Sequence, residues 1–333
     1  MSRTLLPLVL LFTACSSSGT DSADTAGACD VTITTYPASD AASAYYRTNI
    51  EVTLDNPDST VVIETDIPGT QSFSEDGLTV YYTPTSALTP NTDYSYTVHY
   101  CGGDPEIKFH TSDLGTAVTD PQASIKGSSY LLNLKDATIT EPASVGALLG
   151  DQLGEVDIYV NATEVTDTQI TMIGAIGNPD ATTPTQDWCS RSIDFPVADF
   201  SQSPHFVIGG TGTTTITVAG VSVDIQNLEI AGDFAADGSY FGGGTLAGTI
   251  DTRPLDVAFF DGEEGALCKT AGSLGAECQP CGDGQNFCLS LKARDITATK
   301  ADIQITPIYG DDCLGCATAV PADNSDTCAQ EPQ

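Results

Sequence analysis

Basic residues are scarce in this sequence. Eleven Lys and Arg stand against 45 Asp and Glu, which gives a formal net charge of -34 over 333 residues. A surface that binds nucleic acid needs a stripe of Lys and Arg to neutralise phosphates, so nucleic acid is excluded as a partner. The acidic excess is typical of a well-solvated surface. Binding of a divalent cation such as calcium is a weaker alternative, because acidic loops also serve as simple turns.

Histidine is rare as well, and it is the usual base or metal ligand of hydrolytic enzymes. His99 and His110 fall on predicted strands, where exposed positions are expected, and His205 falls in the predicted loop S-Q-S-P-H-F. The motifs G-x-S-x-G, H-E-x-x-H and G-x-G-x-x-G and the Walker loop do not occur. The sequence therefore predicts no catalytic residue, no metal ligand and no cofactor.

Long hydrophobic runs are missing too. The apolar run at residues 5–12, L-L-P-L-V-L-L-F, is far shorter than the ~20 residues that span a bilayer, so no transmembrane helix is predicted. A basic residue precedes this run and small residues follow it, which is the layout of a signal peptide. The segment L-F-T-A-C that ends at Cys15 resembles the lipobox of bacterial lipoproteins. The resemblance implies that residues 1–14 are removed and that Cys15 carries lipid, including palmitate. An ordinary secretory signal is the alternative.

The segment 15–28 is small and polar throughout. After Cys15 it reads S-S-S-G-T-D-S-A-D-T-A-G-A, which has too little apolar surface to fold and is predicted to be a flexible linker. Ser16 occupies the position where, in lipoproteins, aspartate favours retention in the inner membrane. The resemblance therefore implies a location in the cell envelope, anchored by lipid at the outer membrane.

Eleven cysteines are present, an odd number, and lipidation of Cys15 leaves ten. An exported protein meets an oxidising compartment, where ten cysteines are most simply five disulfides. The predicted disulfide cysteines are Cys29, Cys101, Cys189, Cys268, Cys278, Cys281, Cys288, Cys313, Cys316 and Cys328. The connectivity of the eight from Cys189 onward is left open.

Two C-x-x-C pairs, C-Q-P-C and C-L-G-C, offer other chemistries. Structural zinc is disfavoured because 31 residues separate Cys281 from Cys313, outside the usual ribbon spacing. Thioredoxin-like chemistry needs a helix after the first cysteine, whereas C-Q-P-C runs into the turn G-D-G. Neither pair is followed by histidine, which excludes covalent haem.

The remaining chain shows β patterning with little helical periodicity. Short alternating segments rich in Val, Ile, Thr, Tyr and Phe are separated by Gly, Asp, Asn and Pro, which is typical of an all-β sandwich or barrel. We expect two domains, 29–114 and 121–333. The strands predicted in the first domain are 31–35, 49–54, 61–65, 78–83, 93–100 and 107–111.

The second half of the first domain carries a family pattern. An Asp-Gly turn, an alternating strand and a proline are followed by L-x-P-x-T-x-Y and by a last strand that ends in F-x-T. This pattern resembles the bacterial Ig-like domains of envelope proteins, over residues 31–113 only. The matching positions are Asp76, Gly77, Pro84, Leu88, Pro90, Thr92, Tyr94, Val98, Phe109 and Thr111. The resemblance implies an Ig-like β-sandwich that acts as a spacer or a binding scaffold.

In such a sandwich the first strand begins at the same end as the turn that joins the last two strands. Cys29 stands just before the first predicted strand, and Cys101 opens the turn C-G-G-D-P-E. A disulfide needs Cα atoms within about 7 Å, so the Ig-like geometry implies that Cys29 pairs with Cys101. The alternative is that Cys29 belongs to the flexible linker and bonds elsewhere.

The second domain is predicted to be a larger, disulfide-rich β domain with short helices. The expected strands are 130–139, 155–160, 169–173, 214–230, 239–250 and 287–299, and the expected helices are 142–153 and 254–260. A change of phase in the pattern predicts a bulge near Asn227, and Asp237-Gly238 predicts a hairpin turn. Asp233 and Asp237 lack the ligand spacing of an EF-hand, so both are assigned to this hairpin.

Together these features predict a non-enzymatic cell-envelope lipoprotein. An Ig-like spacer would carry a β-rich domain that binds an envelope protein or a glycan, and the lipid on Cys15 would hold it at a membrane. A periplasmic or surface hydrolase, with its site in the second domain, is the alternative. Paired carboxylates suited to glycoside hydrolysis stay open, because 45 acidic residues make any pair possible and single out none.

Overall fold

The computed structural model describes residues 29–308, apart from 75, 143–155, 179–180, 189, 211, 219–220 and 261. The predicted signal peptide, Cys15, the linker, the helix at 142–153 beyond residue 142, and Cys189, Cys313, Cys316 and Cys328 lie outside the described residues. Within the described ranges, no helix is both long and apolar enough to cross a membrane.

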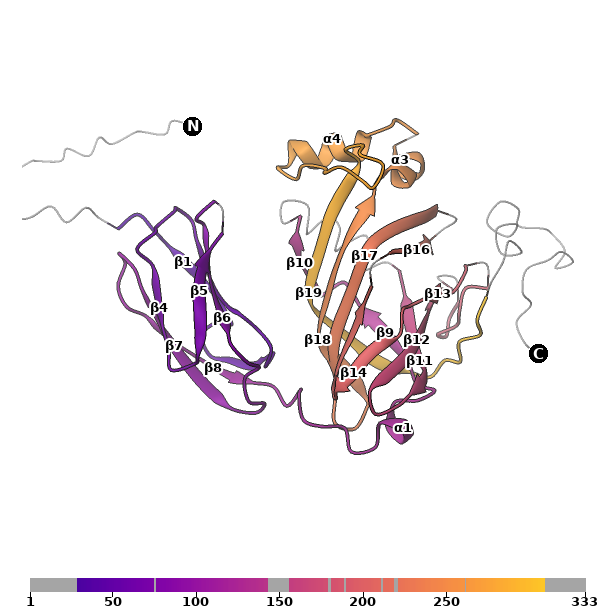
Figure 1. The fold of residues 1–333 in the computed structure, drawn as a ribbon, viewed down its shortest axis with the longest axis horizontal. Coiled ribbons are helices and arrows are strands. Elements are labelled where there is room, and N and C mark those ends of the chain that lie inside the picture. The colour runs from indigo at the N-terminus through magenta and orange to yellow at the C-terminus, as the bar shows by residue number, and fades with distance from the viewer. Residues whose placement is uncertain are drawn as a thin grey trace, which may run out of the picture.

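The first domain, here called the sandwich domain, consists of two packed four-stranded sheets (Figure 1). One sheet has the order β1-β3-β6-β5 and the other β2-β8-β7-β4. The strands are β1 (Ile33–Tyr36), β2 (Ala41–Ala44), β3 (Ile50–Leu54), β4 (Val62–Glu64), β5 (Gly69–Phe73), β6 (Thr79–Pro84), β7 (Asp93–His99) and β8 (Glu106–Thr111). The six predicted strands are confirmed. β2 and β5 were not predicted, because their sequences AASA and GTQSF carry few β-branched residues.

Alternation along the strands builds the core between these sheets. Ile50, Val52 and Leu54 of β3 point inward and are almost fully buried, and Tyr96 and Val98 of β7 meet them from the other sheet. Successive side chains of a strand face opposite sides, so the intervening residues reach solvent or the second domain.

The second domain, here called the closed-sheet domain, is an antiparallel sheet that closes on itself. Its strands follow the order β19-β18-β17-β15-β14-β12-β11-β9, and β9 pairs back with β19. β10 extends the sheet beside β19, β16 beside β17, and β13 pairs with β12. The strands are β9 (Ser129–Asn133), β10 (Thr138–Glu141), β11 (Ile158–Val165), β12 (Gln169–Ile176), β13 (Ile193–Asp194), β14 (Ala198–Gln202), β15 (His205–Gly209), β16 (Thr213–Val218), β17 (Val221–Phe234), β18 (Tyr240–Asp251) and β19 (Cys288–Ala301). The all-β prediction is confirmed.

Aromatic residues fill the inside of the closed sheet. Tyr130, Phe200, Phe206, Phe234 and Phe241 come from five different strands and are all at most 3% exposed. Their rings lie in edge-on and tilted contacts, with Phe206 and Phe234 centroids 5.1 Å apart. Such contacts add to the stabilisation from burial, so this cluster fixes the strands around it.

Short helices lie at the two ends of the closed sheet. α1 (Pro121–Ser124) lies at one end, and α3 (Arg253–Phe259) and α4 (Ala266–Ser273) lie at the other, between β18 and β19 in the chain (Figure 1). The predicted helix at 254–260 is confirmed as α3, whereas α4 was not predicted.

Two strand predictions and one loop prediction need correction. The segment 214–230 is a hairpin of β16 and β17, and the segment 130–139 is divided between β9 and β10. His205 does not lie in a loop but begins β15, because the residues before it form the turn from β14. The predicted bulge is confirmed by the shift of register between Gln226 and Glu229 and by a positive φ of 52° at Asn227.

Candidate functional site at the interface between the two domains

The sandwich domain contacts the outer side of the closed sheet through the connection between β2 and β3. This connection carries Tyr45, Tyr46 and Arg47, and it meets β17 at Asp233, whose carboxylate also contacts His205 on β15. The two tyrosines are separated from Asp233 by 188 and 187 positions in the sequence. Long-range polar contacts of this kind fix how two domains sit against each other.

Asp233 is the centre of this polar cluster and is fully buried. The Tyr46 hydroxyl donates to its Oδ1 at 2.6 Å, and the Tyr45 hydroxyl donates to its Oδ2. Nδ1 of His205, on the neighbouring strand, lies 3.0 Å from the same Oδ2. A buried carboxylate is costly unless hydrogen bonds compensate it, and here the sandwich domain supplies two of the three partners.

Arg47 covers the rim of the cluster. Its Nε donates to the Tyr46 hydroxyl at 2.8 Å, and its Nη2 donates to Oε1 of Gln202, on β14, at 3.0 Å. The guanidinium carbon also lies 5.2 Å from the centre of the Tyr46 ring. Arg47 therefore orients Tyr46, which donates to Asp233. Arg47 also joins the two domains directly through its bond to Gln202.

The glycine-rich part of β18 gives the sandwich domain room to approach. Gly243 has a φ of 59°, and a Cβ atom there would overlap the ring of Tyr45. A Cβ atom at Gly242 would come within 2.9 Å of Leu114. Glycine is needed where another side chain approaches the backbone this closely, so the G-G-G run marks the docking surface.

A second set of contacts lies on β19. The Tyr36 hydroxyl donates to Oδ1 of Asp295 at 2.7 Å, and Nη1 of Arg294 lies 2.7 Å from Oε2 of Glu51. The Arg294 guanidinium also stacks 4.0 Å above the centre of the Tyr36 ring. The flat guanidinium of Arg294 thus stacks on Tyr36 through its face and pairs with Glu51 through its edge.

Burial changes the acid–base behaviour of the interface tyrosines. Burial, followed by the hydrogen bond to Asp233, raises the pKa of Tyr46 to about 12. The pKa values of Tyr36 and Tyr45 are raised further, first by burial and then by the charges of Asp295 and Asp233 respectively. All three hydroxyls therefore remain protonated donors at neutral pH.

His205 is placed to hold Asp233 rather than to act alone. Its side chain is 13% exposed, and its Nδ1 contacts a carboxylate whose two oxygens also accept the tyrosine hydroxyls. His205 and Asp233 resemble the His–Asp pair of a catalytic triad, but the described residues give His205 no hydrogen bond to a serine or cysteine. Together these groups link β15 and β17 of the closed-sheet domain to the sandwich domain.

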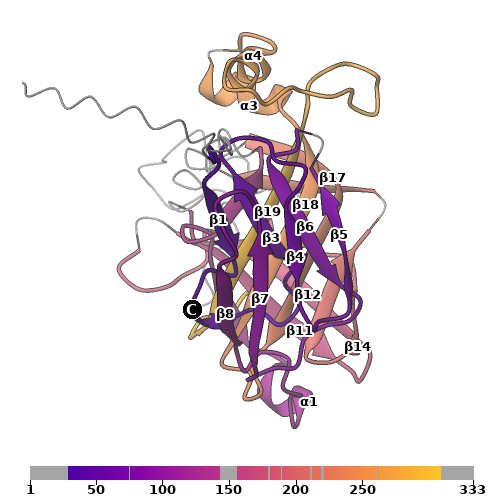
Figure 2. The same cartoon turned by 90° about the vertical axis from the view of Figure 1, so that its left-hand side faces the viewer.

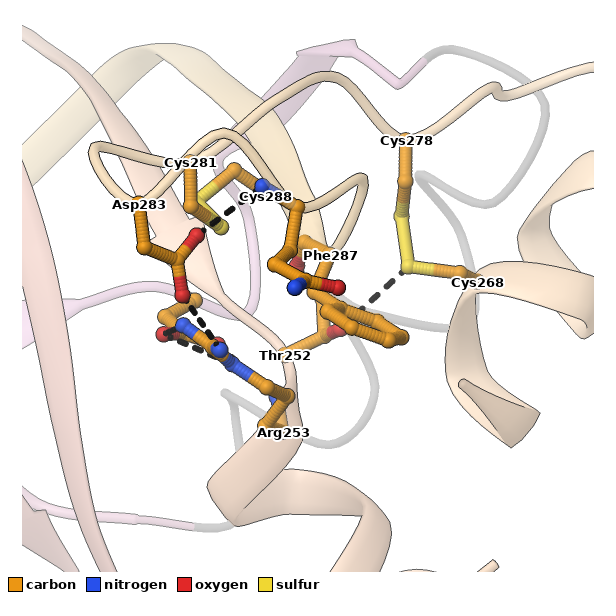
Figure 3. The surroundings of a disulfide bond; sticks show 10 residues. Thr252, Arg253, Cys268, Cys278, Cys281, Asp283, Phe287 and Cys288 are labelled. Carbon is orange, nitrogen blue, oxygen red and sulfur yellow. Dashed lines mark hydrogen bonds and ion pairs between the residues drawn. A yellow bond between two sulfur atoms is a disulfide. The ribbon is translucent and has the colours of Figure 1, made fainter. Parts of the chain in front are cut away.

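Three of the predicted disulfides lie within the described residues. Cys29 is bonded to Cys101 across a sequence separation of 72, with Cα atoms 5.3 Å apart, as the Ig-like resemblance implied. The other two bonds are Cys268–Cys278 and Cys281–Cys288 (Figure 3). The two cysteines of C-Q-P-C are thus joined to different partners, which excludes a C-Q-P-C redox pair and a zinc site on these thiols in the oxidised protein.

These two disulfides hold a compact insertion between β18 and β19. Thr252 at its start bonds the carbonyl of Phe287 at its end, through Oγ1 at 2.8 Å, and Arg253 pairs with Asp251 and Asp283 (Figure 3). The buried Asp256 of α3 accepts from the backbone amides of Gly265 and Leu267 at the start of α4. The insertion is therefore a fixed cap on one end of the closed sheet.

Possible metal ligands are scattered among the described residues. No group of three or more His, Cys, Asp or Glu side chains is placed there to hold a metal ion. His99 lies between Glu64 and Asp104, and His110 lies beside Asp93, each at the surface of the sandwich domain. The expected strand positions of both histidines are confirmed.

The interface was not predicted from the sequence. The prediction that Asp233 belongs to the hairpin turn is wrong: Asp233 lies near the end of β17, and of the two aspartates Asp237 is the one in the turn. The one local signal for it is a carboxylate placed among apolar residues in I-A-G-D-F-A, where a buried acceptor needs donors from elsewhere.

Comparison with known proteins adds little to this geometry. No family model and no curated protein matches the chain. Among solved structures, an L,D-transpeptidase from Mycobacterium smegmatis is similar over 48% of this chain and 82% of its own, with 15% identity and a TM-score of 0.22. A likeness of this extent carries no argument about the fold or activity of this chain.

Proposed function

We propose that this chain is a lipid-anchored protein of the cell envelope, in which the sandwich domain is a rigid support for the closed-sheet domain. The closed-sheet domain then presents a fixed surface that binds an envelope protein or a glycan. The flexible linker connects the two domains to the lipid anchor. The proposal treats the protein as a binding or structural component rather than an enzyme.

The observation that carries the support role is the burial of Asp233 beneath Tyr45 and Tyr46. Separation of the domains would strip the carboxylate of two hydrogen bonds, and hydrogen bonds to a charged group contribute about 1.5–3 kcal/mol each. A loosely tethered spacer has no need of such a contact. The predicted anchor rests on separate features, the lipobox that ends at Cys15 and the polar linker after it.

The anchor is tested by metabolic labelling with palmitate in a bacterial host. We expect label on the wild type and on Ser16→Ala, whose lipobox cysteine is intact, and none on Cys15→Ser. Cys15→Ser should also leave the membrane fraction. Equal labelling of the wild type and Cys15→Ser would refute the anchor.

The rigid support is tested separately, by small-angle X-ray scattering of the mature chain carrying Cys15→Ser. We expect one compact particle whose scattering fits the fixed arrangement of Figure 1. Asp233→Ala should broaden the distribution of interdomain distances. A wild type that already scatters as two independently moving domains would contradict the support role and leave the anchor untouched.

A further inference from the structure

A shallow hollow lies beside the first half of β7 in the sandwich domain. Its volume is about 410 Å³, and it is lined by residues 65–68, 86–89 and 93–95. It belongs to the β2-β8-β7-β4 sheet, which Figure 2 shows in front of the closed sheet, on the side away from the interface. The hollow is thus accessible while the two domains are docked.

The hollow exists because β4 is shorter than β7. β4 pairs with β7 only at Thr97–His99, whereas β8 pairs with β7 along Asp93–Thr97 on the opposite edge. After Glu64 the chain turns away toward Pro68, which has no backbone amide to continue the ladder. The first half of β7 is therefore an open sheet edge.

The backbone of β7 directs hydrogen-bonding groups into the hollow. The backbone groups of Thr92 and Val98 point toward β8. The Thr111 amide donates to the Thr92 carbonyl at 2.9 Å, and the Val98 amide donates to the Pro105 carbonyl at 3.1 Å. Because direction alternates along an antiparallel strand, Asp93 and Ser95 point their amides and carbonyls the other way. On that side the Thr65 hydroxyl bonds the Ser95 carbonyl at 3.0 Å, and within the described ranges the two amides have no protein acceptor.

Charge and shape restrict what the edge can bind. Asp66 and Asp93 both line the hollow and are exposed, in a chain whose net charge is -34. Three residues of open strand extend over about 10 Å, at about 3.3 Å per residue, which suits a short extended segment. Strand addition takes affinity from main-chain bonds and specificity from nearby side chains, so these carboxylates favour a basic residue in the added strand.

We propose that the open edge at Asp93–Ser95 binds an extended peptide segment of a partner protein that carries a basic side chain. The segment adds as a strand beside β7, in line with β4, and its basic group lies near Asp66 and Asp93. This inference goes beyond the support role and does not depend on the lipid anchor.

The test uses the full mature chain carrying Cys15→Ser and a fluorescent, end-blocked hexapeptide, Thr-Val-Lys-Val-Thr-Val. Fluorescence polarisation should show saturable binding. Replacing Lys by Glu in the peptide should weaken binding by about tenfold or more at low salt, because the carboxylates then repel the ligand. A peptide N-methylated at alternate amides should not bind, because it cannot complete the edge hydrogen bonds.

A proline variant tests the protein side of the edge. Ser95→Pro removes the amide that faces the hollow and leaves the bonds to β8, so binding should weaken by about tenfold. Ser95→Ala keeps the amide and should bind within about twofold of the wild type. The melting temperature of each variant shows whether it is folded. If Ser95→Pro proves unfolded, the N-methylated peptide decides the matter on the unaltered protein.

Four results would overturn the proposal. Three concern the peptides: no saturable binding of the Lys peptide, equal binding of the Lys and Glu peptides, and equal binding of the N-methylated peptide. The fourth is equal binding by a folded Ser95→Pro variant.

Discussion

The ring of Tyr45 lies directly on Gly243, and the hydroxyl of the same side chain donates to Asp233 on the neighbouring strand. One tyrosine of the sandwich domain thus makes both a close apolar contact and a buried polar contact with the closed-sheet domain. The backbone at Gly243 and the carboxylate at Asp233 must both be in place for it to fit. This dependence makes the docking sensitive to single substitutions on either side.

The first prediction concerns Gly243→Ala. The new Cβ would overlap the Tyr45 ring at a position with a φ of 59°, so the domains must shift apart or the backbone must change. We expect the free energy of unfolding to fall by about 1–3 kcal/mol, the usual cost of overpacking. Urea unfolding measures this loss, and faster proteolysis between the domains should accompany it.

Gly272→Ala in α4 is the matched control. A Cβ atom there meets no other atom within 4 Å, and alanine is the better helix former. We expect this variant to be neutral or more stable by about 1 kcal/mol. If both alanine variants behave alike, the contact between Tyr45 and Gly243 does not hold the domains together.

The second prediction concerns the buried carboxylate. Asp233→Ala leaves the Tyr45 and Tyr46 hydroxyls without their acceptor, so the free energy of unfolding should fall by roughly 3 kcal/mol. Tyr46→Phe removes one bond to the charged group and should cost about 2 kcal/mol. Glu229→Ala, on the same strand but exposed, should change stability by less than about 0.5 kcal/mol. Chemical denaturation compares the three, and an Asp233→Ala variant as stable as Glu229→Ala would contradict the buried network.

The third prediction is a loss of stability at high pH. The pKa of Tyr46 rises from 10.0 to about 12 in the folded protein, first because the hydroxyl is buried. The folded state therefore holds a proton that the unfolded state releases, and the stabilisation is complete below pH 10 and is lost as the pH rises toward 12. Between these values the slope should be steeper in the wild type than in Tyr46→Phe by about 1.4 kcal/mol per pH unit. Unfolding measured from pH 8 upward checks it, and identical slopes would show that Tyr46 is not buried.

The sequence predicts the strands better than the contacts between them. Alternation of Val, Ile, Thr and Tyr along β3, β6 and β7 is a local property, and it was enough to find them. β5 lacks this composition and is held instead by pairing with β6 and by the Gln71 amide group. The amide donates to the carbonyl of Val61, just before β4, and accepts from the backbone amide of Ile63 on β4. Such pairing depends on distant residues and leaves no local pattern.

The same reasoning explains why the interface was missed while one disulfide was found. The Ig-like pattern orders the strands, and that order places Cys29 beside Cys101. Asp233 and Tyr46 belong to different domains and share no pattern, so their contact depends on docking that no periodicity describes. The prediction of a loop around S-Q-S-P-H-F is wrong, because only Ser203 and Pro204 form the turn, between the end of β14 and the start of β15 at His205.

The fourth prediction ranks the disulfides by the loops that they close. The Cys29–Cys101 bond has a sequence separation of 72, against 10 for Cys268–Cys278 and 7 for Cys281–Cys288. If chain entropy dominates, replacing both cysteines by alanine should cost about 4 kcal/mol for the first pair and about 2–3 kcal/mol for each of the others. Urea unfolding measures the order. A larger loss for Cys281–Cys288 than for Cys29–Cys101 would show that packing in the cap outweighs loop entropy.

The last prediction concerns the four remaining cysteines, Cys189, Cys313, Cys316 and Cys328, which lie outside the described residues. The chain on either side of Cys189 is held beside the residues that precede Cys313. The Gln186 amide exchanges two hydrogen bonds with the backbone of Thr306, at 2.9 and 3.0 Å. Ser192 likewise exchanges two with Ile308, at 3.1 and 2.9 Å.

These contacts favour a bond between Cys189 and the C-terminal segment, because they bring the two parts of the chain together before any disulfide forms. We expect no free thiol in the denatured, unreduced protein and no zinc by elemental analysis. Non-reducing peptide mapping should recover the Cys189 fragment joined to a fragment from residues 309–333. Four titratable thiols with one equivalent of zinc would contradict the disulfides. Cys189 joined to a cysteine of the cap would contradict the two disulfides of the cap, in which Cys268, Cys278, Cys281 and Cys288 are paired with one another.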